Sequence, residues 1–167
     1  MRLPFPFALR VGTDIIACSR ILSPVQPDAK RLARLTARFL HANEVADLDR
    51  RFEHWRNIEA QTELDRRRIA TWIAGRWAAK EAAKKAWGAT LLSFKDLRVE
   101  ADAQGRVQIV CDSGLQHPDR VTEQAGQLSI SHDGDFAIAT VLATPLHHDI
   151  SADLGLRKAE AGAKVTI

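Results

Sequence analysis

The chain is predicted to be a single-domain α+β protein with helices packed on one face of a mainly antiparallel sheet. Two observations predict this class. The expected elements run in the order one strand, then helices, then four strands, and the strongest helical repeat of apolar positions runs over residues 66–87. A chain of 167 residues is long enough for one proper core and short for two.

The N-terminal part is expected to begin with a strand at residues 10–16. A loop is expected at residues 23–27, because that segment contains two prolines. The strand is favoured by three β-branched apolar residues, namely Val11, Ile15 and Ile16.

Helices are expected to follow this loop. Asp28 is the expected N-cap of a helix that runs to about residue 40, and a shorter helix is expected at residues 42–52. Residues 53–65 are polar and carry no clear pattern. The strongest helix is expected at residues 66–87 and should end at Gly88. Its apolar positions recur every four residues, at Ile69, Ile73 and Trp77.

The second half of the chain is expected to form two hairpins. The turn signals are Gln104-Gly105 in the first hairpin and Asp133-Gly134 in the second. The expected strands of the first hairpin, residues 97–101 and 107–111, alternate in polarity, and residues 128–131 and 136–142 form the second pair.

These elements divide the chain into a lead-in at residues 1–9, a domain at residues 10–144 and a tail at residues 145–167. The tail is expected to be either mobile or a short packed helix. The first ten residues are basic and free of acids, which suits a mitochondrial address, but their prolines interrupt the amphipathic helix that such signals use. They are too short for a secretory signal.

Composition argues against several classes of protein. Apolar residues make up 46% and charged residues 27%, which is ordinary for a soluble globular protein. No run reaches the about 18 apolar residues that a transmembrane helix needs. Cys18 and Cys111 match no metal or redox spacing, so we interpret them as reduced thiols in a reducing compartment. The net charge of +3 is too small to indicate nucleic acid.

Basic residues are clustered after the first strand and again at residues 66–68. Such clusters either solvate a helix face or dock an acidic partner or a phosphate-rich ligand, and the sequence leaves both interpretations open. The first cluster consists of Lys30, Arg31, Arg34 and Arg38.

Asp14 is unusual because it interrupts an apolar strand. Aspartate is depleted in strands, and a buried carboxylate needs a partner. It is either a strand-end residue that caps a turn or a metal ligand. Glu81 and Lys85 have a similar ambiguity, since they lie one helical turn apart on the flank of the apolar stripe. They form either a surface ion pair or a site in which Glu81 binds a hard cation and Lys85 neutralises phosphate.

A third group of polar residues ends the strand at 128–131. Here Ser129, Ser131 and His132 are expected to lie together at a sheet edge as donors for a phosphate. A Ser-His-Asp hydrolase is a weaker hypothesis, because there is no Gly-x-Ser-x-Gly elbow. Two carboxylates from separate elements suit Mg²⁺ better than Zn²⁺, and no Cys/His cluster or nucleotide-binding glycine motif is evident.

These places, in this order, resemble the phosphopantetheinyl transferase superfamily of the holo-acyl-carrier-protein synthase type. The resemblance covers about residues 10–143, and the long middle segment resembles the fungal mitochondrial branch. Its motifs are Val11-Gly12-Thr13-Asp14-Ile15-Ile16 with Ser19-Arg20-Ile21, then Arg76-Trp77-Ala78-Ala79-Lys80-Glu81-Ala82 with Lys85, then Leu92-Ser93-Phe94-Lys95-Asp96-Leu97, and finally Ser129-Ile130-Ser131-His132. The hairpin turn departs from the family, with Gly105-Arg106-Val107 in place of Gly-Lys-Pro.

The resemblance implies the phosphopantetheinyl transferase fold and roles for individual residues. Asp14 and Glu81 would bind Mg²⁺, and Lys85 would contact the transferring phosphate. Ser131 and His132 would lie by the 3′-phosphate and adenosine end of coenzyme A, with Arg76 and Lys80 as secondary phosphate contacts. The residues that would meet the acidic helix of an apo acyl carrier protein are Arg20 and, with no motif match, Arg31 and Arg34.

The implied reaction moves 4′-phosphopantetheine from coenzyme A to a carrier-protein serine and releases 3′,5′-ADP, in support of fatty acid biosynthesis. A metal-bound water or Glu81 would take the serine proton. The resemblance also implies a homotrimer, and a mitochondrial location with the cytoplasm as the alternative.

Two other functions compete with this interpretation. A domain that binds coenzyme A or a carrier protein without catalysis is disfavoured by the intact Asp14, Glu81 and Lys85. A nucleic-acid-binding domain is disfavoured because aromatic residues make up only 6% and no stacking surface is evident. No membrane partner is expected.

Overall fold

The computed structural model describes residues 7–21 and 29–163 and confirms the expected α+β class. The expected loop at 23–27 and the Asp28 cap lie outside these residues. Within the described ranges, no helix is long and apolar enough to cross a membrane. The elements are β1 (Arg10–Ala17), η1 (Cys18–Arg20), α1 (Ala29–Phe39), α2 (Ala42–Arg51), η2 (Ile58–Ala60), α3 (Glu63–Trp87), η3 (Phe94–Asp96), β2 (Leu97–Ala101), β3 (Val107–Asp112), β4 (Glu123–Asp133), β5 (Phe136–Ala143) and α4 (His148–Ala163).

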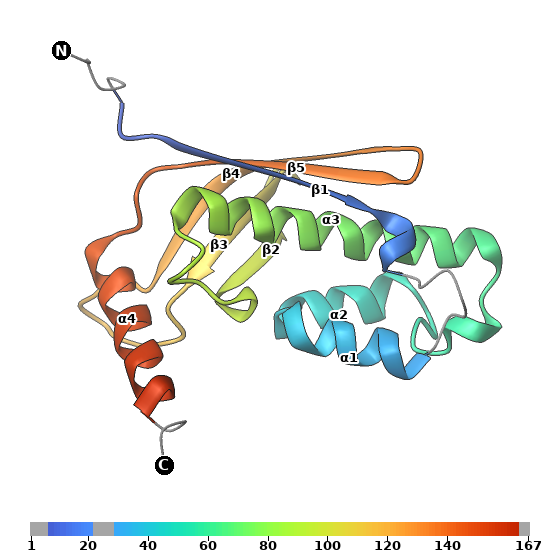
Figure 1. Ribbon diagram of the computed structural model, residues 1–167, viewed down its shortest axis with the longest axis horizontal. Helices are drawn as coiled ribbons and strands as arrows, with labels where there is room; N and C mark the ends of the chain where they lie inside the picture. Colours follow the sequence, from blue (N-terminus) through green and yellow to red (C-terminus); the bar gives the residue numbers. More distant parts are fainter. Residues whose placement is uncertain (1–6, 22–28, 164–167) are drawn as a thin grey trace.

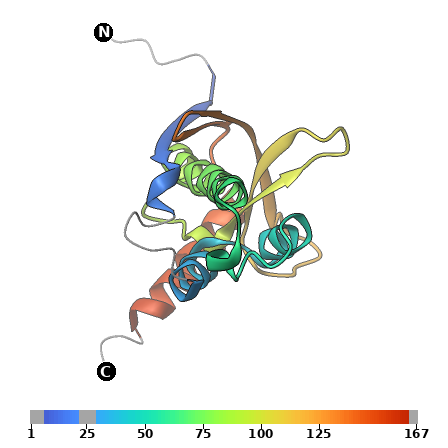
Figure 2. The ribbon, with the colours of Figure 1, turned by 90° about the vertical axis from the view of Figure 1, so that its right-hand side faces the viewer.

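The strands form one antiparallel sheet in the order β1-β5-β4-β3-β2. Strand β4 joins its two halves: residues 123–127 pair with β3, and residues 127–133 pair with β5. The sheet curves around α3, as the view along that helix shows (Figure 2). The expected second hairpin is therefore longer than the sequence indicated, since β4 begins at Glu123 rather than at residue 128.

Helix α3 is the central element of the molecule and lies between the sheet and the pair α1 and α2 (Figure 1). It begins three residues before the expected start, because the Thr62 side chain accepts a hydrogen bond from the Asp65 amide and caps the helix. It ends at Gly88, as expected. Gly88 has a φ of +127°, which a side chain would disfavour. At 1.5 Å per residue the helix is about 37 Å long.

The core fills the space on both sides of α3. Alanines dominate the face that the sheet covers, and small side chains let strands approach closely. On the other side, Phe39 at the end of α1 packs its ring edge against Trp77, with ring centroids 5.1 Å apart. Leu48 of α2 is fully buried as well. This packing fixes the α1–α2 pair against α3.

The segment after β5 forms a packed helix, which was one of the two expected outcomes. Ile150 and Leu154 of α4 are buried in the same core as the rest of the domain. The Arg157 guanidinium binds the buried carboxylate of Asp96 at 2.8 Å. Helix α4 is thus attached to the connection between α3 and β2.

The face of β1 and β5 that is turned away from α3 is exposed and carries large apolar side chains on both sides of a Thr13–Thr140 hydroxyl pair. Strand register places alternate residues of β1 and β5 side by side on this face, with Val11 opposite Leu142 and Ile15 opposite Ile138. Val11 is 64% exposed and Ile15 is 59% exposed. Phe136 extends the same face at the end of β5.

Candidate active site

The candidate site lies where β1 crosses α3. Gly12 allows the crossing, because a Cβ atom there would lie 1.9 Å from the carbonyl oxygen of Ala82. Asp14 is two residues further along β1, so its side chain points to the same face as Gly12, toward α3. The local sequence Gly-x-Asp therefore places a carboxylate against the helix that carries Glu81 and Lys85.

Lys85 links the two elements. Its ammonium lies 2.9 Å from Asp14 Oδ1 and donates a second hydrogen bond to the Thr13 carbonyl at 2.7 Å. Asp14 is mostly buried, with 19% of its side chain exposed, whereas the Lys85 side chain is 52% exposed. The structure thus brings together two of the three expected catalytic residues.

Glu81 lies one helical turn before Lys85 on α3. Its Oε2 is 3.8 Å from the ammonium of Lys84, and its side chain is 28% exposed. The interpretation of Glu81 and Lys85 as a simple surface ion pair is wrong, because Lys85 turns to Asp14 and Glu81 faces Lys84. The site therefore contains two partly buried carboxylates and two ammonium groups.

The oxygen donors of this site fit a hard divalent cation. Asp14 and Glu81 come from different elements, and both retain some exposure to solvent. Mg²⁺ is bound in proteins by one or two carboxylates together with water and substrate phosphate. The Lys85 ammonium on Asp14 already shows that this carboxylate attracts a positive charge.

His132 of β4 also faces α3, nearly two helical turns before Glu81. Its ring packs on Gly75 of α3, with His132 Cε1 only 3.3 Å from where a Gly75 Cβ would lie. Gly75 precedes Glu81 by six residues, or about 9 Å along the helix. Partial burial and the nearby Arg76 guanidinium lower the pKa of His132, so the ring is neutral near pH 7 in the unliganded protein.

Ser131 does not join His132, which corrects the expected cluster of hydroxyls and imidazole. Successive residues of a strand point to opposite faces, and the pairing of β4 with β5 is regular from Gln127 to Asp133. Ser129 and Ser131 therefore lie on the exposed face with Ile138, while His132 faces α3. The sequence correctly placed both residues at a free edge, since β4 beyond Gln127 pairs only with β5 among the described strands.

Lys80 is not a ligand contact, and the expectation that it meets coenzyme A phosphate is wrong. Its side chain is fully buried. The ammonium lies 2.5 Å from Glu44 Oε2 and donates to the carbonyls of Phe39 and Phe94. Burial lowers the pKa of Lys80 to about 8, and Glu44 opposes this shift.

Glu44 is the residue that the sequence analysis missed. Its carboxylate accepts hydrogen bonds from the His41 amide, which caps α2, and from the Val99 amide at the edge of β2. Together with Lys80 it joins α2, α3 and the sheet. No sequence signal identified it, because Glu44 lies 36 residues from Lys80 in a helix of ordinary polar composition.

The Arg76 side chain extends from α3 toward α2. Its guanidinium stacks on the Trp72 ring at 3.4 Å and lies 3.5 Å from Asp47 Oδ2. Burial lowers its pKa to about 10, which leaves it charged at neutral pH. Its buried Nε has no hydrogen-bond partner among the described residues. Arg76 thus places a positive charge beside His132.

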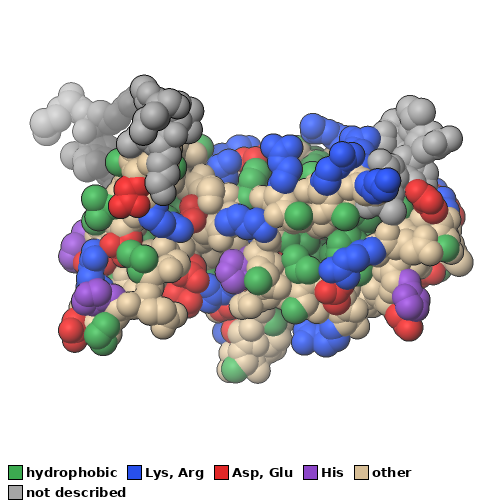
Figure 3. Space-filling view, turned by 90° about the horizontal axis from the view of Figure 1, so that it is seen from below, with side chains coloured by type: hydrophobic (Ala, Val, Ile, Leu, Met, Phe, Trp, Pro, Cys, Tyr) green, Lys and Arg blue, Asp and Glu red, His purple; other side chains and the backbone are tan. Residues whose placement is uncertain are grey.

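The arginines expected to dock a carrier protein are all exposed. Arg20 is in the short η1 turn directly after β1, and Arg31 and Arg34 lie on α1. Lys and Arg side chains gather on the face seen from below, on the side of the molecule where α1 and α2 lie (Figure 3). Asp135 fixes the η1 turn by accepting from the Ser19 amide at 3.0 Å.

Three possible metal ligands also cluster at the start of α4, outside the candidate site. The ligand atoms of His147, His148 and Asp149 lie within 4.8 Å of one another. Both oxygens of Asp149 already accept hydrogen bonds, one from Arg120 and one from the Val121 amide. The nearby guanidinium and the positive end of α4 disfavour a bound cation there.

Comparisons with known proteins agree on one family. The model of the 4′-phosphopantetheinyl transferase superfamily matches residues 10–141. A mitochondrial 4′-phosphopantetheinyl transferase B of Aspergillus fumigatus is 41% identical over 84% of this chain and 97% of that protein. A holo-[acyl-carrier-protein] synthase of Corynebacterium glutamicum is 33% identical over 81% of this chain and 98% of that protein.

A solved structure supports the same assignment. The holo-(acyl-carrier-protein) synthase of Bacillus anthracis, determined in complex with CoA (3′,5′-ADP), is 27% identical and superimposes with a TM-score of 0.50 over 82% of this chain and 96% of that one. The expected fold and the expected class of enzyme are thereby confirmed. The chain belongs to the 4′-phosphopantetheinyl transferase superfamily and is an enzyme of the holo-acyl-carrier-protein synthase type.

Proposed function

We propose that this enzyme transfers 4′-phosphopantetheine from coenzyme A to a serine of an apo acyl carrier protein and releases 3′,5′-ADP. The observation that carries the proposal is the contact of Lys85 with Asp14, one turn from Glu81, at the β1–α3 crossing. Support comes from the relatives named as 4′-phosphopantetheinyl transferase and holo-[acyl-carrier-protein] synthase, and from the Bacillus anthracis structure in complex with CoA (3′,5′-ADP). The reaction places the enzyme in support of fatty acid biosynthesis.

Asp14 and Glu81 would hold Mg²⁺. When bound, the ion neutralises charge on the pyrophosphate of coenzyme A. Lys85 would then exchange its contact with Asp14 for a contact with the phosphate that transfers. Because Lys85 is more than half exposed, this exchange requires no large rearrangement of the core.

His132 and Arg76 would bind the 3′-phosphate end of coenzyme A. Arg76 precedes Glu81 by five residues, about 7.5 Å along α3, and His132 packs on Gly75, which directly precedes Arg76. One extended ligand could therefore contact His132 and Arg76 at one end and the metal at Glu81 at the other. Arg76 is charged and held in place by Trp72 and Asp47. A phosphate bound beside Arg76 and His132 would also favour the protonated form of His132. Ser131 faces away from α3 and Lys80 is buried against Glu44, so neither belongs to this binding site.

The carrier protein would dock on the basic side of the molecule, through Arg20 of η1 and Arg31 and Arg34 of α1. Acidic helices and exposed arginines attract each other over distance, which speeds association at low salt. Arg20 is close in sequence to Asp14, so docking there would bring the carrier serine toward the β1–α3 crossing.

We further propose a homotrimer that buries the exposed apolar face of β1 and β5, and a mitochondrial location, with the cytoplasm as the alternative. Contiguous apolar patches on a protein surface usually mark an interface. The 41% identity with a protein named as mitochondrial supports the location. Fluorescent fusion of the full chain and co-localisation with a mitochondrial marker would test it.

The reaction is tested by mixing the purified chain with apo acyl carrier protein, coenzyme A and Mg²⁺ and measuring the mass of the carrier. A gain of one phosphopantetheine that is lost with a chelator supports the proposal. Tight binding of coenzyme A with no gain on several carriers would instead support the non-catalytic binding protein.

A further inference from the structure

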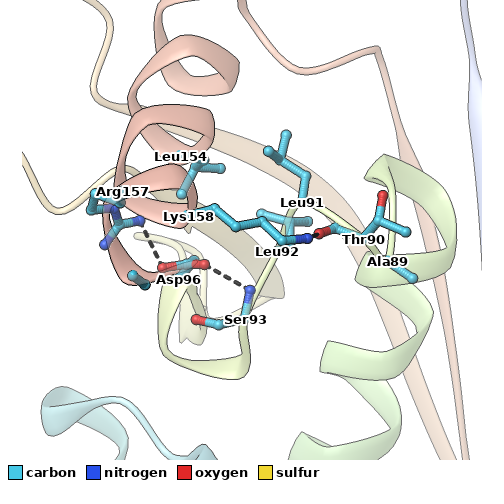
Figure 4. A pocket seen from close by; sticks show the side chains of 10 residues that line it. Ala89, Thr90, Leu91, Leu92, Ser93, Asp96, Leu154, Arg157 and Lys158 are labelled. Atoms are coloured by element: carbon cyan, nitrogen blue, oxygen red, sulfur yellow. Dashed lines mark hydrogen bonds and ion pairs between the residues drawn. The ribbon is translucent and has the colours of Figure 1, made fainter. Parts of the chain in front are cut away.

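A cavity of about 510 Å³ lies between α4 and the connection from α3 to β2 (Figure 4). Its volume is within the range of small-molecule sites in proteins, about 300–1,000 Å³. Helix α4 lies beyond residues 10–141, which match the superfamily. One wall of the cavity therefore lies outside the matched residues, and none of the residues that line the cavity belongs to the β1–α3 crossing.

The inner wall of the cavity is apolar. Leu92 and Leu154 are 5% and 2% exposed, so both are fixed in the core. Leu91 is half-buried beside them, and Ala89 and Ala161 form the outer rim. This wall can contact an aliphatic group of a ligand without any rearrangement of the core.

Two cationic side chains of α4 also line the cavity. Arg157 binds Asp96 at 2.8 Å, and Asp96 also accepts from the Ser93 amide at 2.7 Å. The charge of Arg157 is therefore matched by a carboxylate. Lys158 donates to the carbonyl oxygen of Thr90, which is neutral (Figure 4). The residues that line the cavity thus carry one positive charge in excess.

We propose that this cavity binds a small monoanion with an aliphatic body, specifically a medium-chain carboxylate. One excess positive charge matches one carboxylate. A phosphate monoester carries nearly two negative charges at pH 7 and would place excess charge beside Asp96. The carboxylate would replace the Thr90 carbonyl as the partner of Lys158, and the chain would lie against the leucines. The inference does not depend on the proposed transfer reaction.

The full chain should be titrated with sodium octanoate by calorimetry, with hexanoate, 1-octanol and octyl phosphate as comparators. We expect saturable binding of one octanoate, weaker binding of hexanoate because less apolar surface is buried, and weaker binding of octanol because it lacks the charge. Octanoate should also raise the midpoint of thermal unfolding, because it binds the folded chain.

Two variants locate the site. Lys158→Gln should weaken octanoate binding about fivefold, the size expected for one exposed ion pair. Arg106→Gln removes the same charge from the turn between β2 and β3 and should leave binding unchanged. Ala161→Trp adds bulk at the exposed rim and should abolish binding, while an unchanged unfolding midpoint would show that the fold is intact.

The proposal is overturned if octanoate does not bind saturably, or if Lys158→Gln and Ala161→Trp both bind as tightly as the parent chain. Tighter binding of octyl phosphate than of octanoate would overturn the assignment to a monoanion. Because the readout is binding alone, these outcomes are independent of whether phosphopantetheine is transferred.

Discussion

Asp14 and Lys85 neutralise each other in the structure, and the proposed reaction gives each a new partner. The carboxylate would meet a cation, and the ammonium would meet a phosphate. Since Lys85 is half exposed, its ion pair contributes little stability that the exchange would lose. The pair therefore keeps both groups satisfied between turnovers without resisting the entry of ligand.

Glu81→Gln should reduce transfer at least about 100-fold, because the amide cannot neutralise a divalent cation as a carboxylate does. Initial rates at saturating coenzyme A and carrier, with the carrier mass as readout, would measure the loss. Glu63→Gln is the matched control, because it removes an exposed carboxylate from the first turn of the same helix. Parent-like turnover of Glu81→Gln at saturating Mg²⁺ would refute the metal assignment.

Lys80→Met should lower the free energy of unfolding by about 3 kcal/mol, because it leaves the Glu44 carboxylate buried without its counterion. Urea denaturation measures this change. Adding Glu44→Gln to that variant removes both charges and should recover part of the loss, since one backbone amide keeps its acceptor. A double variant less stable than Lys80→Met would show that the backbone contacts of Glu44 matter more than the ion pair.

His132 should make ligand binding depend on pH. Its pKa is lowered in the free protein, and an adjacent phosphate would raise it, so binding takes up a proton. The affinity for 3′,5′-ADP should therefore rise as pH falls from 8 to about 6. Calorimetry at several pH values should show a weaker dependence in His132→Gln. The exposed control His117→Gln should behave as the parent, and an equal slope in all three proteins would contradict the role of His132.

At the scale of elements, the close crossing of β1 and α3 is what brings the site together. Gly12 lies directly on the carbonyl of Ala82, so the strand has no room to approach with any larger residue. The crossing sets the distance between Asp14 and the turn of α3 that carries Glu81 and Lys85. The site is thus a property of how two elements pack rather than of one motif.

Gly12→Ala should lower the free energy of unfolding by about 3 kcal/mol and reduce transfer, because β1 must move away from α3. Gly155→Ala is the control: its added methyl group meets open space on helix α4, so it should be neutral or stabilising by up to about 1 kcal/mol. Thermal and urea unfolding of both variants would measure the difference. A Gly12→Ala protein of parent stability would mean that the crossing can relax.

Most elements were predictable because their apolar periodicity agrees with their final packing, as in α3 and β5. The first half of β4 was missed because its side chains are mostly polar or small, and Gly126 packs there against Trp87. Helix α4 was left open because Gly155 and Gly162 weaken its helical signal. The burial of Lys80 could not be predicted, since its partner Glu44 is brought to it only by tertiary packing.

The exposed apolar face of the sheet concerns the whole molecule. The face combines side chains of the first and last strands, and five of its residues are large and exposed: Val11, Ile15, Phe136, Ile138 and Leu142. Between them lies the Thr13–Thr140 hydroxyl pair, and a monomer rarely leaves so many large apolar side chains on one face in water. The proposed trimer would bury it.

Ile138→Asp should convert the trimer into a monomer, because it places a charge at the centre of this face. Light scattering should give three times the chain mass of 18.5 kDa for the parent and one chain mass for the variant. Leu64→Asp is the control, since Leu64 is equally apolar and 68% exposed but lies at the start of α3. A monomeric parent would refute the trimer.

The pairing of β1 with β5 also has a consequence for biosynthesis. Among the described strands β1 pairs only with β5, and Arg10 pairs with Ala143, so the strand that carries Asp14 lacks this partner until residues 136–143 have been made. A chain emerging from the ribosome N-terminus first presents an exposed apolar β1 throughout the synthesis of the helices and the first hairpin. Contacts of such long sequence separation form slowly. The enzyme therefore cannot act before release of nearly the whole chain, and the emerging strand needs protection from pairing with other chains.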